Sequence, residues 1–422
     1  MNIIAAGMRN SLPVVDGLGK LQLTLALLFI AASAAPALYI SPIILAFLIY
    51  NAIIQMAVFV ASGYRGKLAY PYYSLFALLM LIYCIFNAML SGLKINEIFN
   101  YDAIRYDGNI FYSFLPFFVF TSTGACEINV DRWIRAISLL APVTYVIAEA
   151  LGYPIFESHN AAGGYFMVLL AYVLGRIETD NLHGWRLPLV FLLMALIVSD
   201  SRGSLGAVLI VFIIYKASIV SPRTVKAMMV LGALCIIGAL AYAYSFWHSN
   251  GSVFLYDYAV FAPNAEGLDF SAFMIGERPG TVLHRIFFLY PMAIDMFLHS
   301  PIFGVGFTRF DDFPIQYGNG INLISMNVTG SIQHTNFHAH NSYLHILSEL
   351  GLLGLVLFAL LIRGIFRAFR QDKWTGIPAR FMLGALLVAS MTEHRLTTPS
   401  QAAPVFIMIG VLWACSKSRN RC

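Results

Sequence analysis

Long apolar stretches alternate with short polar connections along most of this chain of 422 residues. A stretch of about 20 apolar residues can cross a hydrocarbon core of roughly 30 Å as a helix. We therefore expect an all-α polytopic membrane protein with about twelve transmembrane helices. The apolar stretches lie near residues 17–34, 40–61, 70–91, 110–125, 134–151, 161–175, 187–199, 203–220, 227–248, 342–362, 377–392 and 402–416.

The pattern changes between the ninth and the tenth apolar stretch. Residues 249–341 are mostly too polar to span a membrane, which predicts one large loop between residues 1–248, with nine spans, and residues 342–422, with three spans and a tail. Within the loop, a segment from Arg285 onward is amphipathic, but Pro291 and Asp295 make it a poor span. We expect it to form a helix that lies against the bilayer surface or caps the bundle.

Composition supports the membrane class. Hydrophobic residues make up 59% of the chain and charged residues 11%, with a mean hydropathy of +0.75. Such a chain cannot present a solvated globular surface. The net charge of +5 follows from the membrane topology described next, so we expect membrane lipids around the chain and no nucleic-acid partner.

Basic residues set the orientation, because cytoplasmic loops carry an excess of Lys and Arg. Placing both termini in the cytoplasm puts 19 of the 26 Lys and Arg residues on the inner side. The same orientation puts the large loop on the outer side. Topology gives no reason for the seven basic residues left there, which are Lys94, Arg105, Arg202, Arg278, Arg285, Arg309 and Arg395.

Histidines gather on the outer side as well, and they are densest at the end of the large loop. The sequence there reads His334-x3-His338-x-His340-Asn341. Histidine is the side chain best suited to take and give protons near neutral pH. His340 and His338 are therefore the candidates for a general base, with Asn341 beside them, and the residues alone do not choose between the two histidines.

The helix expected after this cluster carries further polar residues. We expect Ser342 to cap its N-terminus, although His340 could itself be no more than a cap. His345 and Glu349 then share one helical face with Ser342. Glu349 would lie about two turns into the membrane, where an ionisable group indicates either a functional site or a structural hydrogen-bond network.

Arginines at two other outer positions could join the histidines. Asp200 and Arg202 lie in a turn between two apolar helices, so Arg202 either pairs with Asp200 or faces an anionic ligand. Arg278 and Arg285 flank the start of the amphipathic segment, and Arg309 follows it. Guanidinium groups of this kind bind phosphate oxygens through two donors at once.

Four features of the sequence together resemble the O-antigen ligase and polymerase family. The segment from Arg285 to Phe307 ends in Pro301-x-x-Gly-Val-Gly-Phe, which is similar to the arginine-rich segment of that family. His340-Asn341, nine residues, Gly351, two residues and Gly354 match its H-N-x9-G-x-x-G pattern without a gap. The Ser201-Arg202-Gly203 turn and the twelve spans with one large outer loop also resemble it, so the resemblance covers essentially the whole chain.

The resemblance implies glycosyl transfer at the periplasmic face of a bacterial inner membrane. The donor would be a glycan linked to undecaprenyl diphosphate, and in a ligase the acceptor would be a sugar hydroxyl of lipid A-core, giving lipopolysaccharide. His340 or His338 would be the base, and Arg202 and Arg285, with Arg278 and Arg309 as further candidates, would hold the diphosphate. A single displacement would invert the anomeric carbon, and neither ATP nor another cofactor is expected.

Other interpretations stay open. An O-antigen polymerase or a protein O-oligosaccharyltransferase of the same superfamily shares the donor and the base and differs in the acceptor. His334, His338 and His340 could ligate zinc, and Asp311-Asp312 could bind another metal ion, although arginines can replace a metal ion at a diphosphate; we expect no metal. A transporter is disfavoured because the polar residues gather at the outer rim instead of the midplane.

Overall fold

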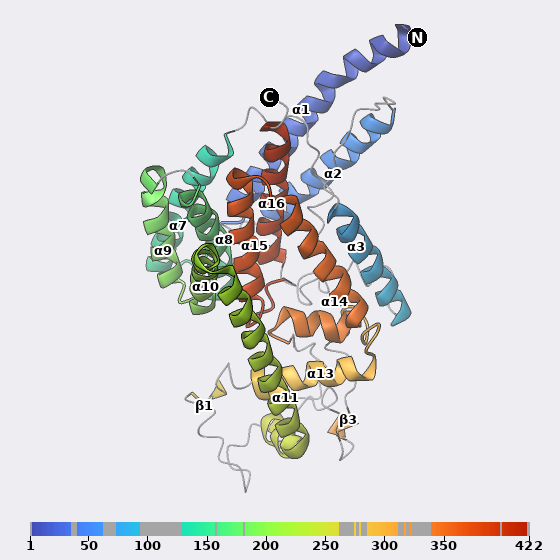
Figure 1. The fold of residues 1–422 in the computed structure, drawn as a ribbon, viewed down its shortest axis with the longest axis vertical. Coiled ribbons are helices and arrows are strands. Elements are labelled where there is room, and N and C mark those ends of the chain that lie inside the picture. Colours follow the sequence, from blue (N-terminus) through green and yellow to red (C-terminus); the bar gives the residue numbers. More distant parts are fainter. Residues whose placement is uncertain are drawn as a thin grey trace.

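The protein is described by a computed structural model in which helices dominate (Figure 1). It describes residues 2–34, 40–61, 73–92, 129–156, 158–179, 182–260, 274–275, 278–279, 285–310, 316–317, 321–322, 339–396 and 399–419. The helices are α1 (Asn2–Ala32), α2 (Ile40–Ala61), α3 (Tyr73–Leu90), α7 (Val130–Ala150), α8 (His159–Ile177), η4 (Leu182–Trp185), α9 (Arg186–Val198), α10 (Arg202–Val220), α11 (Pro222–Val260), η6 (Arg285–Leu289), α13 (Tyr290–His299), α14 (Ser342–Ala368), α15 (Lys373–Ala389) and α16 (Pro399–Arg419).

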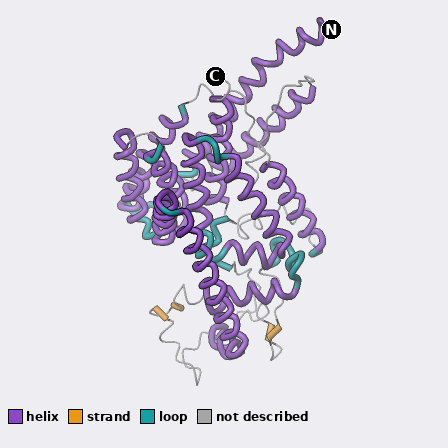
Figure 2. Tube along the Cα trace, in the orientation of Figure 1, coloured by secondary structure: helices purple, strands orange, loops and turns teal. Residues whose placement is uncertain are grey.

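Strands are confined, in the described part of the chain, to two antiparallel pairs of two residues each (Figure 2). They are β1 (Met274–Ile275) with β2 (Arg278–Pro279) and β3 (Gln316–Tyr317) with β4 (Ile321–Asn322). The expected all-helical class is therefore confirmed apart from these hairpins.

Most of the predicted spans coincide with helices. Every predicted span except 110–125, which lies outside the described residues, overlaps one helix. Among the described residues, six helices are long and apolar enough to cross a membrane, and four shorter apolar helices accompany them. The count of twelve spans stays a prediction. The division at residues 248 and 341 also stays one, although α11 continues past the first boundary to Val260.

The helices differ in how much of them the protein itself buries. Of the most apolar window of α8, 78% is buried, whereas the corresponding figure for α11 is 6%. α8 packs against α9, α10, α15 and α16 and lies in the middle of the bundle (Figure 1). Lipid tails solvate an apolar helix as well as a protein core does, so the exposed apolar side chains of α11 are suited to a membrane.

The amphipathic segment forms η6 and α13, as predicted. Figure 1 shows α13 running crosswise to α15 at the end of the molecule away from the start of α1 and the end of α16. α13 packs against α14 and α11. Asp295, which made this segment a poor span, accepts a hydrogen bond of 2.9 Å from the Tyr244 hydroxyl of α11.

α14 is interrupted at Gly351, and residues 301–306, which follow α13 and are called the inserted segment below, pack into the interruption. Gly351 has a φ of +64° and non-helical geometry inside the helix. On one side of the break, the Leu352 amide donates to the Pro301 carbonyl at 2.9 Å; on the other, the Gly306 amide donates to the Glu349 carbonyl at 3.1 Å. Backbone groups that the break would leave without partners are thus satisfied.

The close approach of this segment to α14 requires glycine in both of them. A Cβ on Gly351 would lie 2.4 Å from the Ile302 carbonyl oxygen, and a Cβ on Gly304 would lie 2.3 Å from the Glu349 backbone. α3 fastens the inserted segment, because the Asn87 amide donates to the Phe303 carbonyl at 2.6 Å. The two glycine motifs of the sequence therefore form one packed unit just below the start of α14.

Candidate active site

His340 stands immediately before α14 with a φ of +48°, a conformation that histidine tolerates better than most side chains. The helix is capped by its neighbour: Asn341 Oδ1 accepts hydrogen bonds from the amides of Tyr343, at 3.0 Å, and Leu344, at 3.1 Å. The expectation that Ser342 is the N-cap is wrong. His340 is not the cap of this helix either, and its ring makes other contacts.

Ser342 instead ties α14 to the turn formed by residues 390–396, which connects α15 to α16. Its amide donates to the Ser390 carbonyl at 2.9 Å. Its hydroxyl donates to the Glu393 carbonyl at 3.3 Å and accepts from the Leu396 amide at 3.1 Å. The 390–396 turn is therefore held against the start of α14 through backbone atoms, which fixes the side chains that the turn carries.

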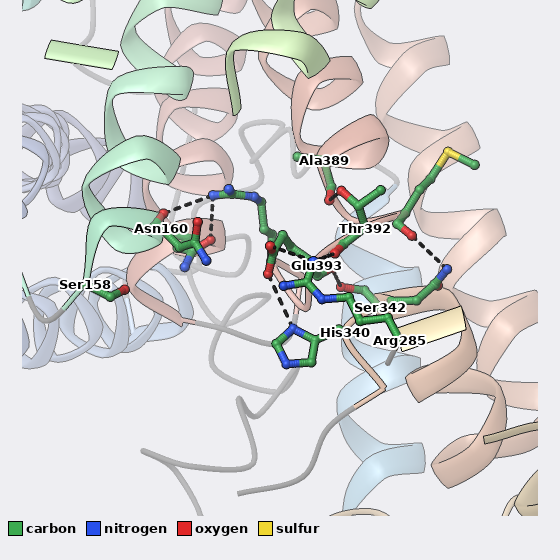
Figure 3. A network of polar contacts seen from close by, with 12 residues as sticks. Ser158, Asn160, Arg285, His340, Ser342, Ala389, Thr392 and Glu393 are labelled. Atoms are coloured by element: carbon green, nitrogen blue, oxygen red, sulfur yellow. Dashed lines mark hydrogen bonds and ion pairs between the residues drawn. The ribbon is translucent and has the colours of Figure 1, made fainter. Parts of the chain in front are cut away.

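Glu393, in this turn, contacts both His340 and Arg285 (Figure 3). Its Oε2 lies 3.5 Å from His340 Nδ1, and its Oε1 accepts from Arg285 Nη1 at 3.0 Å. The same Nη1 donates to the Thr392 carbonyl at 2.7 Å. One carboxylate thus joins a candidate base and a candidate phosphate-binding group that are distant in the sequence.

The surroundings of Glu393 favour its ionised form. Burial alone would raise the pKa of this carboxyl, but its contact with His340 and the positive charges of Arg285 and Arg395 hold the pKa below the ordinary value. Glu393 is consequently negative at neutral pH. A negative carboxylate beside Nδ1 favours the histidine tautomer with its proton on Nδ1 and its lone pair on Nε2.

His394 brings a second imidazole to His340. The two rings lie 5.4 Å apart, edge to face. One ligand atom from each of His340, Glu393 and His394 lies within 4.8 Å of the others, so the three side chains could hold a metal ion. Glu393, however, already shares its charge with Arg285, and that guanidinium opposes a nearby cation. The expected absence of a metal stays a prediction.

Arg202 and Asp200 form the pair that was one of the two interpretations of their turn. Arg202 Nε lies 3.1 Å from Asp200 Oδ1, and the Arg202 side chain is 89% exposed. Asp200 has a φ of +46°, which turns the chain sharply between α9 and α10. A pair this exposed contributes little to stability, so Arg202 can exchange Asp200 for an anionic ligand at small cost.

The end of the segment after α13 is held in place by contacts of His345, Glu349 and Arg309. His345 Nε2 lies 3.4 Å from Glu349 Oε2, and both side chains are buried. The other Glu349 oxygen accepts from the Phe310 amide at 3.1 Å. Arg309 donates to the Ser91 carbonyl at 3.0 Å. The geometry thus favours the network interpretation of Glu349, because these contacts hold residues 309 and 310 against α14 and the end of α3.

Several predicted site residues are not described to the same extent. His338 and His334 lie outside the described residues, as do Asp311 and Asp312. Arg278 is described through its backbone alone, which pairs with Ile275 in the first hairpin. The structure therefore brings together His340, Asn341 and Arg285 from the predicted set.

Part of the chain matches a known protein family. Residues 187–359 match the family model described as O-Antigen ligase. This part of the chain is therefore similar to the O-antigen ligase superfamily. A search of the curated proteins finds no match.

The O-antigen ligase match runs from the start of α9 into α14 and so contains Arg202, Arg285 and His340. It ends before the 390–396 turn. The resemblance drawn from the H-N-x9-G-x-x-G pattern is confirmed by this match, and the two glycines of that pattern are the ones that shape α14 below the site.

Sequence reasoning missed Glu393, His394 and Arg395 as members of the site. The predicted span 377–392 ended just before them, whereas α15 ends at Ala389. One signal was available. Arg395 was among the outer arginines that topology could not explain, and it is only 1% exposed.

Proposed function

We propose that this protein is an O-antigen ligase, which transfers a glycan from undecaprenyl diphosphate to a sugar hydroxyl of lipid A-core. The family match and the membrane-spanning helices support a membrane glycosyltransferase of the ligase and polymerase superfamily. The observation that carries the proposal further is the Glu393 carboxylate between His340 and Arg285. It sets a proton acceptor beside a phosphate-binding group, and this reaction requires both.

His340 acts as the general base. With its Nδ1 directed at Glu393, its Nε2 is available to take the proton of the acceptor hydroxyl. The hydroxyl oxygen forms a bond to the anomeric carbon while the bond from that carbon to the diphosphate oxygen breaks. Glu393 stabilises the imidazolium that results, and attack opposite the leaving group inverts the anomeric carbon. His338 is the second candidate for this role.

Arg285 receives the departing diphosphate. Its hydrogen bonds within the described part of the chain use Nη1 alone, so Nε and Nη2 can donate to phosphate oxygens. Arg202, exposed and paired with Asp200, supplies a second guanidinium. Arg278 and Arg309 are further candidates. Positive charge placed where negative charge develops stabilises the transition state.

Such a reaction needs neither ATP nor a metal ion. The diphosphate of the donor is already a good leaving group, and guanidinium groups can neutralise its charge. Undecaprenyl diphosphate and lipid A both carry hydrocarbon tails. These tails stay in the bilayer during the reaction, so membrane lipids surround both substrates.

The proposed location is a bacterial inner membrane, with the site facing the periplasm and both termini in the cytoplasm. Two features support it. The start of α1 and the end of α16 point toward the same end of the molecule (Figure 1). The His340 cluster is built at the N-terminus of α14 and the C-terminus of α15, which the basic residues of the sequence assign to the outer side.

The acceptor distinguishes the members of the superfamily. The purified protein, reconstituted in proteoliposomes with undecaprenyl-diphosphate-linked glycan, is offered lipid A-core without ATP or added metal. A glycan-bearing lipopolysaccharide product supports the ligase. Lengthening of glycan on the carrier would instead identify a polymerase, glycan on an added acceptor protein an O-oligosaccharyltransferase, and movement of chemically unchanged donor a transporter.

A further inference from the structure

Arg395 is a buried cation, and its hydrogen-bond partners among the described residues are neutral groups. Its side chain is 1% exposed. Nη1 donates to Gln401 Oε1 at 2.9 Å and to the Asn160 carbonyl at 3.2 Å, and Nη2 lies 3.5 Å from the Ser201 hydroxyl. In the described part of the chain, none of these acceptors is a carboxylate. Burying a guanidinium without a direct ion pair is costly. We therefore expect both its positive charge and its forked set of N–H donors to have a role at this position.

α8 is shaped to admit this group. A Cβ on Gly164 would lie 2.6 Å from Arg395 Nη1, and a Cβ on Gly163 would lie 2.1 Å from the Ser201 side chain. Two adjacent glycines near the start of α8 therefore let both the guanidinium and the Ser201 turn approach the helix backbone. This close fit involves three separate segments of the chain: α8, the turn before α10 and the 390–396 turn.

The two turns that meet at Arg395 carry the two halves of the proposed chemistry. Ser201 directly precedes Arg202, which belongs to the phosphate-binding half. Arg395 itself follows Glu393 by two residues and so belongs to the half that holds His340. The charge also matters on this side, because Arg395 is one of the positive groups that keep the Glu393 pKa low.

We propose that Arg395 is a positioning residue that holds the turn carrying Arg202 against the turn carrying Glu393. The diphosphate-binding guanidinium and the base then keep a fixed separation. This inference rests on the proposed function, since it assumes that Arg202 binds the donor diphosphate. Arg395 remains protonated in this role, because burial lowers its pKa only to about 10.

The test is a double-mutant cycle on the binding of undecaprenyl diphosphate to the purified full-length protein in nanodiscs. Arg202→Ala removes one guanidinium from the diphosphate and is expected to weaken binding about tenfold. Arg395→Gln is expected to weaken it by a similar factor through displacement of Arg202. The double variant is then expected to bind no more than about twofold more weakly than Arg202→Ala, because interacting residues do not contribute additively.

Two further variants refine the readout. Arg395→Lys keeps the charge and a single donor group and is expected to regain part of the lost affinity. Arg186→Gln, which changes an exposed arginine at the opposite end of α9, is the matched control and is expected to bind like the wild type. Should Arg395→Gln fail to fold, Ser201→Ala takes its place in the cycle, with a smaller loss that Arg202→Ala again masks.

Additive losses in the double variant would overturn the inference, and so would wild-type affinity in Arg395→Gln or equal losses in the Lys and Gln variants. Failure of the proposed function looks different. In that case the wild type itself would not bind undecaprenyl diphosphate, or Arg202→Ala would bind it as the wild type does.

Discussion

Oε2 of Glu393 lies 3.5 Å from Nδ1 of His340, and the 390–396 turn is bonded to the start of α14 so that this pair stays together. A carboxylate at Nδ1 is the usual way in which a protein orients a histidine base and stabilises its protonated form. The relationship gives His340 a role that a capping histidine would not need.

Removing the charge of Glu393 should change both the rate and its pH dependence. Glu393→Gln cannot stabilise the imidazolium of His340, so we expect the plateau rate to fall about 10- to 100-fold. Protonation of Glu393 in acid removes the same charge, so the rate of the wild type should approach that of the variant as the pH falls.

Because the contact with His340 and the charges of Arg285 and Arg395 hold the pKa of Glu393 below its ordinary value, the carboxylate is ionised at neutral pH and its contribution is lost only as the pH falls into the acid range. A pH–rate profile of wild type and variant measures both effects. A Glu393→Gln variant as fast as the wild type at neutral pH would mean that the carboxylate does not act through His340.

Arg285 should be needed for the donor more than for the acceptor. Arg285→Lys keeps one positive charge but loses the forked donor geometry, so we expect the KM for the undecaprenyl-diphosphate donor to rise about tenfold, with a smaller change in the KM for the acceptor. Steady-state kinetics with each substrate varied in turn measures the difference. The control is Arg186→Lys, at an exposed position on α9; equal effects on both KM values would contradict a diphosphate role for Arg285.

Gly351 should be essential to the fold. A Cβ there would meet backbone atoms of the inserted segment at 2.4 to 2.5 Å, and the φ of +64° is unfavourable for alanine. We expect Gly351→Ala to destabilise the protein by about 2 kcal/mol or more, seen as a lower Tm in detergent. Gly232→Ala, in α11 with nothing within 4 Å of its Cβ, should leave the Tm unchanged or slightly higher; equal losses in both variants would refute the packing argument.

Metal removal should not affect transfer. Although His340, Glu393 and His394 lie close enough to bind an ion, Arg285 occupies the same carboxylate. We expect the rate of the reconstituted protein to be the same before and after exhaustive treatment with a chelator. A loss of activity that Mg²⁺ or Mn²⁺ restores would show that the three side chains hold a catalytic metal.

The helices could be predicted well from the sequence, because the length and the hydropathy of a stretch are enough to indicate a membrane helix. The span expected at residues 40–61 matches α2 residue for residue, and the amphipathic segment with Pro291 and Asp295 is the crosswise η6 and α13. These properties are local. A helix that must satisfy its own backbone hydrogen bonds in lipid leaves the same signature wherever it packs.

The site was only half predictable, because its other half is defined by contacts between distant segments. His340 and Arg285 stood out through residue type and motif. Glu393 did not, since its role depends on how the 390–396 turn docks on Ser342. Gly351 stood out only as part of the H-N-x9-G-x-x-G pattern, whereas in the structure it permits a break in α14 that Gly304 and its neighbours enter. No periodicity along one segment encodes such a fit.

The central claim is that His340 is the base of a glycan transfer. The most direct test is the reconstituted reaction of donor with lipid A-core, without ATP or metal, for wild type, His340→Ala and Arg285→Ala, with His299→Ala on α13 as the histidine control. The account predicts transfer by the wild type and the control, and loss of about 100-fold or more in the His340 and Arg285 variants. Undiminished transfer by His340→Ala, with donor and acceptor both bound, would contradict it.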